Sequence, residues 1–280
     1  MMEEILLEPS HEGDYSDDED YAQTLRTLLS CLLTESGTSV AEVEGLRVFE
    51  PLAERWDYIR NGVEVPASDA QHLLVNMVIS DNPGFSCELV VGHVSRVRVG
   101  WDGGVHLYLP REIANVVAEH LESRDAKVSR EVTAAFPQAS LDNPVTRPTD
   151  SSFWSEVRER RGSFTLLCER WAEGPAGFRW FRINDQNLDS VVARIEQRSL
   201  VFVVVNPDLE LSESVIDEGF TAFSSPLLPG ELAYEKFGFA DDVAVLRKAG
   251  YDLALPDSDW GDLCAVVPDI DGIVPMTWDW

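Results

Sequence analysis

Strict alternation of apolar and polar residues on both sides of a glycine-containing loop constrains the fold more than any other pattern in the chain. Apolar side chains occupy every second position in Val97–Trp101 and again in Val105–Leu109. Successive side chains of a β-strand point to opposite faces of the sheet, so this pattern predicts a hairpin with one apolar face. With Asp102-Gly103-Gly104 as a three-residue loop, Val99 lies opposite Leu107 and apolar residues face one another along the hairpin.

Apolar periodicities elsewhere predict further helices and strands. A second hairpin is expected around the turn Glu173–Gly177, followed by a helix and then by the strand Leu200–Val205. Helical spacing of apolar residues recurs in residues 21–33, 68–78, 110–121 and 241–249. The sequence therefore predicts an α+β fold with two sub-domains, each with a β-hairpin followed by a helix, and with mostly antiparallel sheet. Whether the two halves arose by duplication stays open.

Composition divides the chain into four segments. Residues 1–20 end in a like-charge run from Asp14 to Asp20, which predicts an acidic disordered tail. Residues 21–135 and 151–280 are expected to form an N-terminal and a C-terminal α+β domain, the second with an acidic, loop-rich end. Residues 136–150 contain three prolines and are interpreted as a linker.

The chain carries 50 acidic against 22 basic residues, which gives a formal net charge of −28. Such a charge repels nucleic acid and anionic membranes and attracts basic partners. We therefore expect a basic protein partner and no binding to nucleic acid or membrane. The net charge is −11 over residues 1–60, −4 over residues 61–200 and −13 over residues 201–280. This uneven distribution argues against the uniform acidic coat of a salt-adapted protein, which stays an alternative.

Cysteine usage and the lack of targeting signals predict a cytoplasmic protein. The start lacks the basic segment of a signal peptide, and apolar runs such as Leu200–Val205 are too short to span a bilayer. The four cysteines are widely spaced in apolar surroundings, which predicts free thiols in a reducing compartment. Only three lysines accompany nineteen arginines, a bias typical of GC-rich bacterial genomes.

No motif in the chain predicts a catalytic residue, a cofactor or a metal ion. Nucleophile, phosphate-binding, dinucleotide-binding and zinc-protease motifs are all missing. The acidic segment that begins at Asp257 is similar to a calcium loop, but Gly261 and Pro268 stand at its fifth and twelfth positions, where ligands are required. We therefore expect no catalytic residues, no cofactor and no metal.

Two groups of residues are candidates for binding. The polar face of the first hairpin predicts either an anion or phosphodiester site or an ordinary exposed sheet face. Its members are Arg96, Arg98, His106 and Tyr108. An acidic contact surface with a tryptophan anchor is expected near the C-terminus. Its members are Asp241, Asp242, Asp257, Asp259, Trp260 and Asp262. The terminal Trp278 and Trp280 are either interface anchors or are docked on their own domain.

The run from Val97 to Tyr108 resembles a hairpin that recurs in bacterial immunity-type proteins of polymorphic toxin systems. The resemblance implies a small, acidic, cytoplasmic and non-enzymatic protein that neutralises a toxin by covering its active surface. It covers twelve residues and transfers no functional residue to this chain.

Together these observations predict a non-enzymatic acidic binding protein, an immunity or inhibitor protein that occludes a basic partner such as a nuclease toxin. One alternative is an enzyme that acts on a phosphorylated or nucleotide substrate through Arg98, His106 and Tyr108. Another alternative is a nucleic-acid mimic, whose carboxylates are spaced like phosphates. The sequence leaves open the partner, the oligomeric state and the acidic face that makes the contact.

Overall fold

The computed structural model shows an α+β protein with two compact units, Met1–Ser140 (unit 1) and Leu141–Trp280 (unit 2). The predicted fold class is confirmed, and the division between the units falls inside the segment interpreted as a linker. Within the described ranges, no helix combines the length and the hydrophobicity needed to cross a bilayer. The structure describes residues 1–8, 15–80, 82–100, 102–124, 126–133, 144–259, 261, 263–274 and 278–279.

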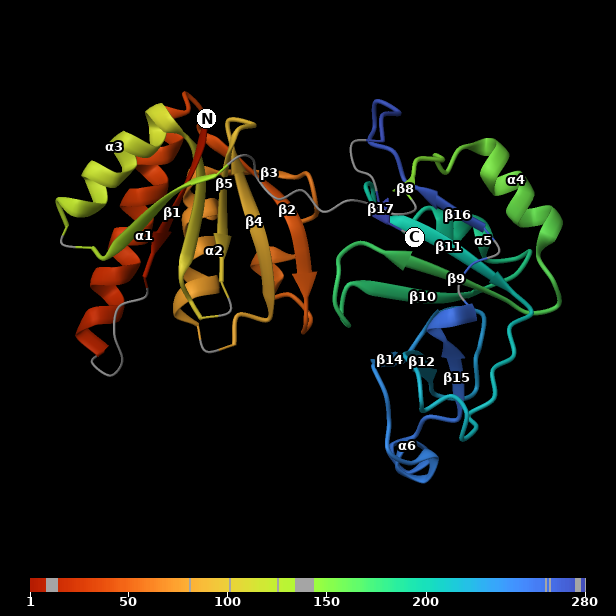
Figure 1. Ribbon diagram of the computed structural model, residues 1–280. Helices are drawn as coiled ribbons and strands as arrows, with labels where there is room; N and C mark the ends of the chain where they lie inside the picture. Colours follow the sequence, from red (N-terminus) through yellow and green to blue (C-terminus); the bar gives the residue numbers. More distant parts are fainter. Residues whose placement is uncertain are drawn as a thin grey trace. The chain divides into compact units, whose positions relative to one another are not determined.

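Unit 1 is an antiparallel seven-stranded sheet with three helices on one side (Figure 1). The strand order is β3-β2-β4-β5-β6-β1-β7. The strands are β1 (Met2–Leu7), β2 (Val40–Val48), β3 (Glu64–Pro66), β4 (Phe85–Val91), β5 (Ser95–Val99), β6 (Val105–Pro110) and β7 (Val128–Thr133). The helices are α1 (Tyr15–Glu35), α2 (Ala67–Ile79) and α3 (Arg111–Glu122), with a 3₁₀ turn at Glu54–Trp56. Apolar side chains fill the face under the helices, and the opposite face is mostly polar.

Strand β1 lies between β6 and β7, and residues 15–20 are in α1, so these parts of the predicted disordered tail are ordered, whereas residues 9–14 of that prediction lie outside the described residues. Ile5 and Leu7 face the helices and are buried, and their alternation with less buried residues is typical of a half-buried strand. Glu3 shares this buried face, where its carboxylate pairs with Arg130 and lies 3.3 Å from Arg111 Nε. The described part of the acidic run, residues 15–20, forms the start of α1, where negative charge is stabilised by the helix N-terminus.

The hairpin β5–β6 keeps its predicted faces in a different register. Val99 lies opposite Val105, not opposite Leu107. The Gly100 N–H donates to the Gly104 carbonyl at 2.7 Å, so the three-residue loop begins one residue earlier than predicted. The pairing is shifted by two residues, and each side chain stays on its predicted face because the side-chain period of a strand is two.

Unit 2 contains a five-stranded sheet, a three-stranded sheet and one short strand pair, all antiparallel (Figure 1). Their strand orders are β13-β10-β9-β11-β16, β14-β12-β15 and β17-β8. The strands are β8 (Pro144–Val145), β9 (Thr165–Arg170), β10 (Phe178–Ile183), β11 (Leu200–Val205), β12 (Phe220–Phe223), β13 (Gly230–Leu232), β14 (Tyr234–Phe237), β15 (Leu253–Pro256), β16 (Leu263–Val266) and β17 (Trp278–Asp279). The helices are α4 (Ser151–Arg160), α5 (Leu188–Val192) and α6 (Val243–Ala249), with a 3₁₀ turn at Asp257–Asp259. The hairpin β9–β10 is followed by α5, as the sequence predicts.

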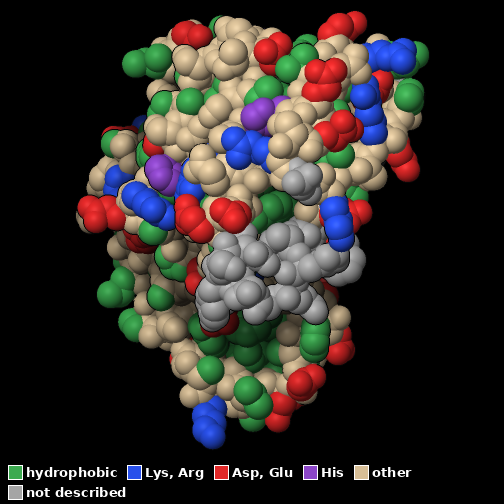
Figure 2. Space-filling model, turned by 90° about the vertical axis from the view of Figure 1, so that its left-hand side faces the viewer, with side chains coloured by type: hydrophobic (Ala, Val, Ile, Leu, Met, Phe, Trp, Pro, Cys, Tyr) green, Lys and Arg blue, Asp and Glu red, His purple; other side chains and the backbone are tan. Residues whose placement is uncertain are grey.

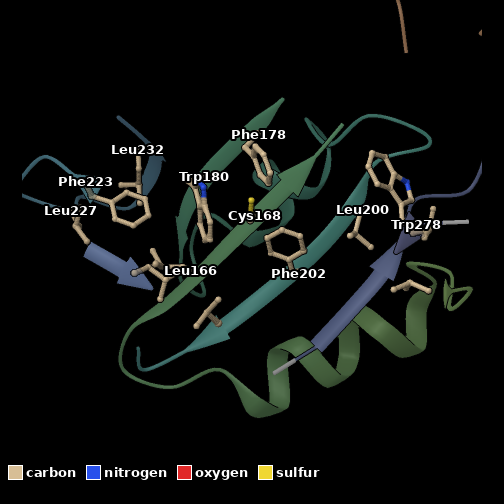
Figure 3. Packing of buried hydrophobic residues seen from close by; sticks show 14 residues of the cluster. Leu166, Cys168, Phe178, Trp180, Leu200, Phe202, Phe223, Leu227, Leu232 and Trp278 are labelled. Atoms are coloured by element: carbon tan, nitrogen blue, oxygen red, sulfur yellow. The ribbon is translucent and has the colours of Figure 1, made fainter. Parts of the chain in front are cut away.

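The five-stranded sheet is the middle layer of unit 2, which explains why β9 is buried on both faces. One face packs against α4 and α5 through residues such as Phe153 and Val191. The other face carries a second cluster, drawn in Figure 3, in which the Trp180 ring meets Phe202 and Phe223 edge to face. The ring centres are 6.1 and 5.5 Å apart. Aromatic packing of this geometry stabilises a core beyond its buried area.

Strand β9 also buries one carboxylate, that of Glu169. Arg179 Nε donates to Glu169 Oε2 at 2.7 Å, and the Ser199 hydroxyl and the Glu196 N–H donate to Oε1 at 3.0 and 2.8 Å. Burial raises the pKa of Glu169, and the Arg179 guanidinium opposes that rise. Every polar contact of this carboxylate is inside unit 2, so Glu169 has a structural role.

The terminal tryptophan Trp278 is docked on unit 2. Its side chain is in the cluster of Figure 3, and its Nε1–H donates to the Arg198 carbonyl at 3.0 Å. The Arg170 guanidinium lies 5.1 Å from the centre of its ring. Of the two roles that the sequence leaves open, the structure shows docking for Trp278, whereas Trp280 lies outside the described residues.

Replacing Trp278 with alanine is expected to lower the free energy of unfolding by about 3 to 5 kcal/mol, because a large buried ring and its hydrogen bond are lost. Chemical denaturation followed by circular dichroism measures the change. The matched control is Ile270→Ala, since Ile270 is 95% exposed and its removal leaves stability nearly unchanged. Equal stability of both variants would contradict a docked Trp278.

Candidate functional site

The four polar residues predicted on the first hairpin lie together on the face of the unit 1 sheet opposite the helices. Arg96 is opposite Tyr108, and Arg98 is opposite His106, in adjacent strands β5 and β6. Three carboxylates from neighbouring strands contact the cations or the imidazole of this face. The polar sheet face, as we define it, consists of Glu4, Glu44, Glu88, Arg96, Arg98, His106 and Tyr108.

Glu4 is the functional candidate that the sequence reasoning missed. Its Oε1 lies 2.8 Å from His106 Nδ1, and it also forms a hydrogen bond with Tyr108. A carboxylate at Nδ1 orients an imidazole ring and leaves Nε2 for other partners. The sequence offers no clear signal for Glu4, because Glu3-Glu4-Ile5-Leu6-Leu7 does not alternate polar with apolar residues, and the alternation appears only as burial in the folded strand.

The arginines of the polar sheet face are neutralised by its own carboxylates. Arg96 Nη1 is hydrogen-bonded to Glu44 and lies 3.5 Å from Glu88 Oε2. Arg98 Nε is 3.9 Å from Glu88 Oε1, and its side chain is 55% exposed. Arg98 is therefore the cation of this face most accessible to a ligand, whereas Arg96 is held between two glutamates.

Burial raises the pKa of the Glu88 carboxyl above its ordinary value, and Arg96 and Arg98 only partly offset this effect. Burial also raises the pKa of Tyr108, and the carboxylate of Glu4 adds to the rise. Tyr108 is consequently a neutral phenol at physiological pH. The seven residues so defined hold three carboxylates against two guanidiniums and one imidazole, so their charges are balanced and leave little excess positive charge for a phosphodiester.

The residues predicted for the acidic contact surface have different surroundings. Asp241 is exposed. Asp242 caps α6, and its Oδ1 accepts from the Ala244 N–H at 2.6 Å. Asp257 Oδ2 lies 3.7 Å from Lys236 Nζ. Trp260 and Asp262 lie outside the described residues, and Asp259 is described only as part of a 3₁₀ turn. Among the three members whose side chains are described, Asp241, Asp242 and Asp257, no shared contact is found.

In the described part of unit 2, unpaired acidic side chains are instead concentrated in residues 207–257, which we call the acidic lobe. It comprises the three-stranded sheet, β13 and α6, with α6 at the end away from the five-stranded sheet (Figure 1). The lobe has eleven acidic and three basic residues, whereas residues 141–206 have nine of each. All eleven acidic side chains of the lobe are exposed.

Seven of these eleven acids form no hydrogen bond or ion pair through their side chains to any other described residue. They are Asp208, Glu210, Glu213, Asp217, Glu218, Asp241 and Asp252. In residues 141–206, by contrast, six of the nine acids are paired with arginines, as in Glu156 with Arg147 and Asp189 with Arg158. The lobe therefore carries a negative charge that the described parts of the protein leave uncompensated.

Two large apolar side chains of the acidic lobe are exposed beside its acids. Phe239 is 70% exposed and Val245 is 63% exposed, and Asp241 and Asp242 lie between them in the chain. Phe239 takes the place of Trp260 as the described aromatic candidate for contact with a partner. The available signal was an aromatic residue that follows a glycine and stands two positions before an acidic pair.

The uneven charge along the sequence does not give the two compact units different net charges. Residues 1–140 contain 25 acids and 10 bases, and residues 141–280 contain 25 acids and 12 bases, so the net charges are −15 and −13. Acidic and basic side chains are interspersed on the face drawn in Figure 2. The uneven charge along the chain is thus no argument against an acidic coat shared by both units, and the local contrast lies inside unit 2.

Among the described residues, no group of three or more histidine, cysteine, aspartate or glutamate side chains is arranged to hold a metal ion. The four cysteines are free, as the sequence predicts. Comparison with protein-family models, curated proteins and solved structures gives no match to the chain.

The Glu88 carboxyl is expected to titrate above the ordinary glutamate range, and Arg96→Gln is expected to move its midpoint higher because a stabilising cation is removed. Carboxyl ¹³C shifts followed against pH measure both midpoints, with Glu88→Gln for assignment. Arg124→Gln, at an exposed position, is the control that leaves the midpoint in place.

The sign of the linked stability follows from the raised pKa of Glu88. The folded state binds the Glu88 proton more tightly than the unfolded state does. The stabilisation gained in this way has its full value below the pKa of the unfolded state and is lost as pH rises through the pKa of the folded state. Glu88→Gln should therefore flatten this part of the pH profile of stability. A midpoint at or below the ordinary value would overturn the assignment.

Proposed function

We propose that the chain is a non-enzymatic acidic binding protein that occludes a basic partner, as an inhibitor of the immunity type does with a protein such as a nuclease toxin. The observation that carries the proposal is the acidic lobe, with seven exposed acids that no described residue neutralises. The resemblance of the Val97–Tyr108 hairpin to immunity-type proteins supports the same class of function.

Unpaired like charges on one lobe repel one another and weaken the folded state, and a basic partner relieves that repulsion. Their long-range field also accelerates encounter with a positively charged protein. Exposed Phe239 and Val245 supply apolar contact area beside the acids. Interfaces in general draw most of their affinity from such aromatic and apolar anchors, and charged residues at the rim set the association rate.

The second candidate function is an enzyme that acts on a phosphorylated or nucleotide substrate. The hydrogen bond between Glu4 and His106 favours it, because an oriented imidazole is a common general base. The internal neutralisation of Arg96 by Glu44 and Glu88 counts against it, since only Arg98 is left to attract an anionic substrate.

Neutralising three acids of the lobe, Glu213→Gln with Asp217→Asn and Asp241→Asn, is expected to slow association with the basic partner by about tenfold at low salt, and the difference should shrink as salt rises. The control removes the same charge from exposed positions on α3, with Glu112→Gln, Glu119→Gln and Glu122→Gln. Stopped-flow association rates compare the two variants. Equal rates for the two variants would exclude steering by the acidic lobe.

The partner needed for this measurement is first identified by photo-crosslinking. Phe239 is replaced with a photo-crosslinking amino acid in the full chain, which is expressed in its native host. Val132, 68% exposed in unit 1, carries the same group as the matched control. A basic protein crosslinked from position 239 and not from position 132 supports the proposal. Capture of an acidic or neutral protein at position 239 counts against it.

The two candidate functions differ in the effect of His106→Ala on hydrolysis of bis(4-nitrophenyl) phosphate. An enzyme that uses His106 as general base loses its activity in this variant at an almost unchanged melting temperature. The binding function predicts no turnover above background for either the original chain or the variant. Release of nitrophenol is read at 400 nm, where about tenfold over background is readily detected.

A further inference from the structure

Unit 2 contains an apolar groove with a volume of about 390 Å³. Its lining is made of Phe164, four leucines, two prolines and a single charged residue, Arg182. The lining residues come from the loop before β9, from β10, from β15 and from the loops around residues 207–209 and 226–228. A groove of this size, mostly apolar with one polar group, is typical of sites for small organic ligands.

The floor of the groove is continuous with the hydrophobic core. Leu227 belongs to the buried cluster, and Phe164, Leu209 and Leu253 are partly buried against it. In Figure 3, Leu227 lies at the end of the cluster opposite Trp278. Leu228 is 64% exposed at the same groove, so an apolar ligand would cover surface that is now in water.

Arg182 differs from the other arginines of its hairpin. Arg170 pairs with Glu173 and Arg179 pairs with Glu169, whereas Arg182 has no carboxylate within ion-pair distance among the described residues. Its Nη1 donates to the Leu227 carbonyl, and its guanidinium carbon lies 4.7 Å from the centre of the Phe164 ring. These contacts hold the guanidinium in place and leave its Nε and Nη2 donors without a described acceptor.

We propose that this groove binds a small monocarboxylate with an apolar tail, of the class of medium-chain fatty acids. The carboxylate accepts from Arg182, whose planar donors match its two oxygens, and the tail lies on the leucine floor. A single negative charge suits the site because Arg182 is the one cation among its lining residues. Six of the eight lining residues belong to the acidic lobe, whose negative field opposes every anion and opposes a multiply charged phosphate more strongly than a monocarboxylate. This site goes beyond the proposed binding of a basic partner and does not depend on it.

The test titrates the full chain with decanoate, decanamide and acetate, and follows methyl ¹H–¹³C signals of the leucines. Decanoate is expected to shift the signals of Leu209, Leu227, Leu228 and Leu253 in a saturable way. Decanamide, which keeps the tail and lacks the charge, is expected to bind at least about tenfold more weakly, and acetate is expected not to bind, because the tail supplies most of the burial.

Variants assign the binding to Arg182. Arg182→Gln should weaken decanoate binding about tenfold and leave decanamide binding unchanged, whereas Arg182→Lys should restore part of the loss because it keeps the charge. Arg158→Gln on α4 is the control for net charge and leaves binding unchanged. The melting temperature of each variant verifies folding, and Leu228→Asp, at an exposed position, gives a second independent loss of binding.

Three outcomes overturn the proposal. Equal affinities for decanoate and decanamide would mean that Arg182 does not recognise the carboxylate. Shifts spread over the methyl groups of unit 1 would indicate detergent-like association without a site. Tighter binding of a peptide with a hydrophobic C-terminal residue than of decanoate would make the groove a peptide site.

Discussion

The pairing of β1 with β6 and β7 is the interaction on which unit 1 depends. It places the first strand of the chain inside the sheet, beside strands about one hundred residues later, and gives Ile5 and Leu7 their buried positions. The same strand presents Glu3 to two arginines on the helix side and Glu4 to His106 on the polar side. Because successive residues of a strand face opposite ways, one short segment supplies both a buried structural carboxylate and the acid of the candidate site.

Regions of the molecule differ in whether their carboxylates are paired with arginines. On the polar sheet face and in the sheet half of unit 2, acids are held by nearby arginines, and Glu169 is fully enclosed. In the acidic lobe, seven exposed acids have no such partner among the described residues. Paired acids stabilise the fold and have little influence at a distance, whereas unpaired exposed acids act on charged molecules in solution. This difference, and not the net charge alone, makes the lobe the better candidate for contact with a basic partner.

Much of the candidate site was predictable because it depends on local alternation. The four polar residues of the β5–β6 hairpin share one face as predicted, and a two-residue error in register did not disturb this, since the side-chain period is two. Glu4 was missed because its position beside His106 depends on a pairing between residues 102 positions apart. Asp242 and Asp257 carry the right charge in the sequence, but one caps a helix and the other faces Lys236, and neither role can be read from composition.

By itself the sequence determined the class of fold, the hairpins and helices, and the large negative charge, because these follow from local periodicity and from counting residues. Only the tertiary structure decided which charges are neutralised, that Trp278 is docked, and that Arg182 lies at an apolar groove with no carboxylate partner among the described residues. The physical reason is that ion pairing and burial depend on distances of a few ångströms between side chains from distant segments. Those distances exist only after the strands have paired and the sheets have packed.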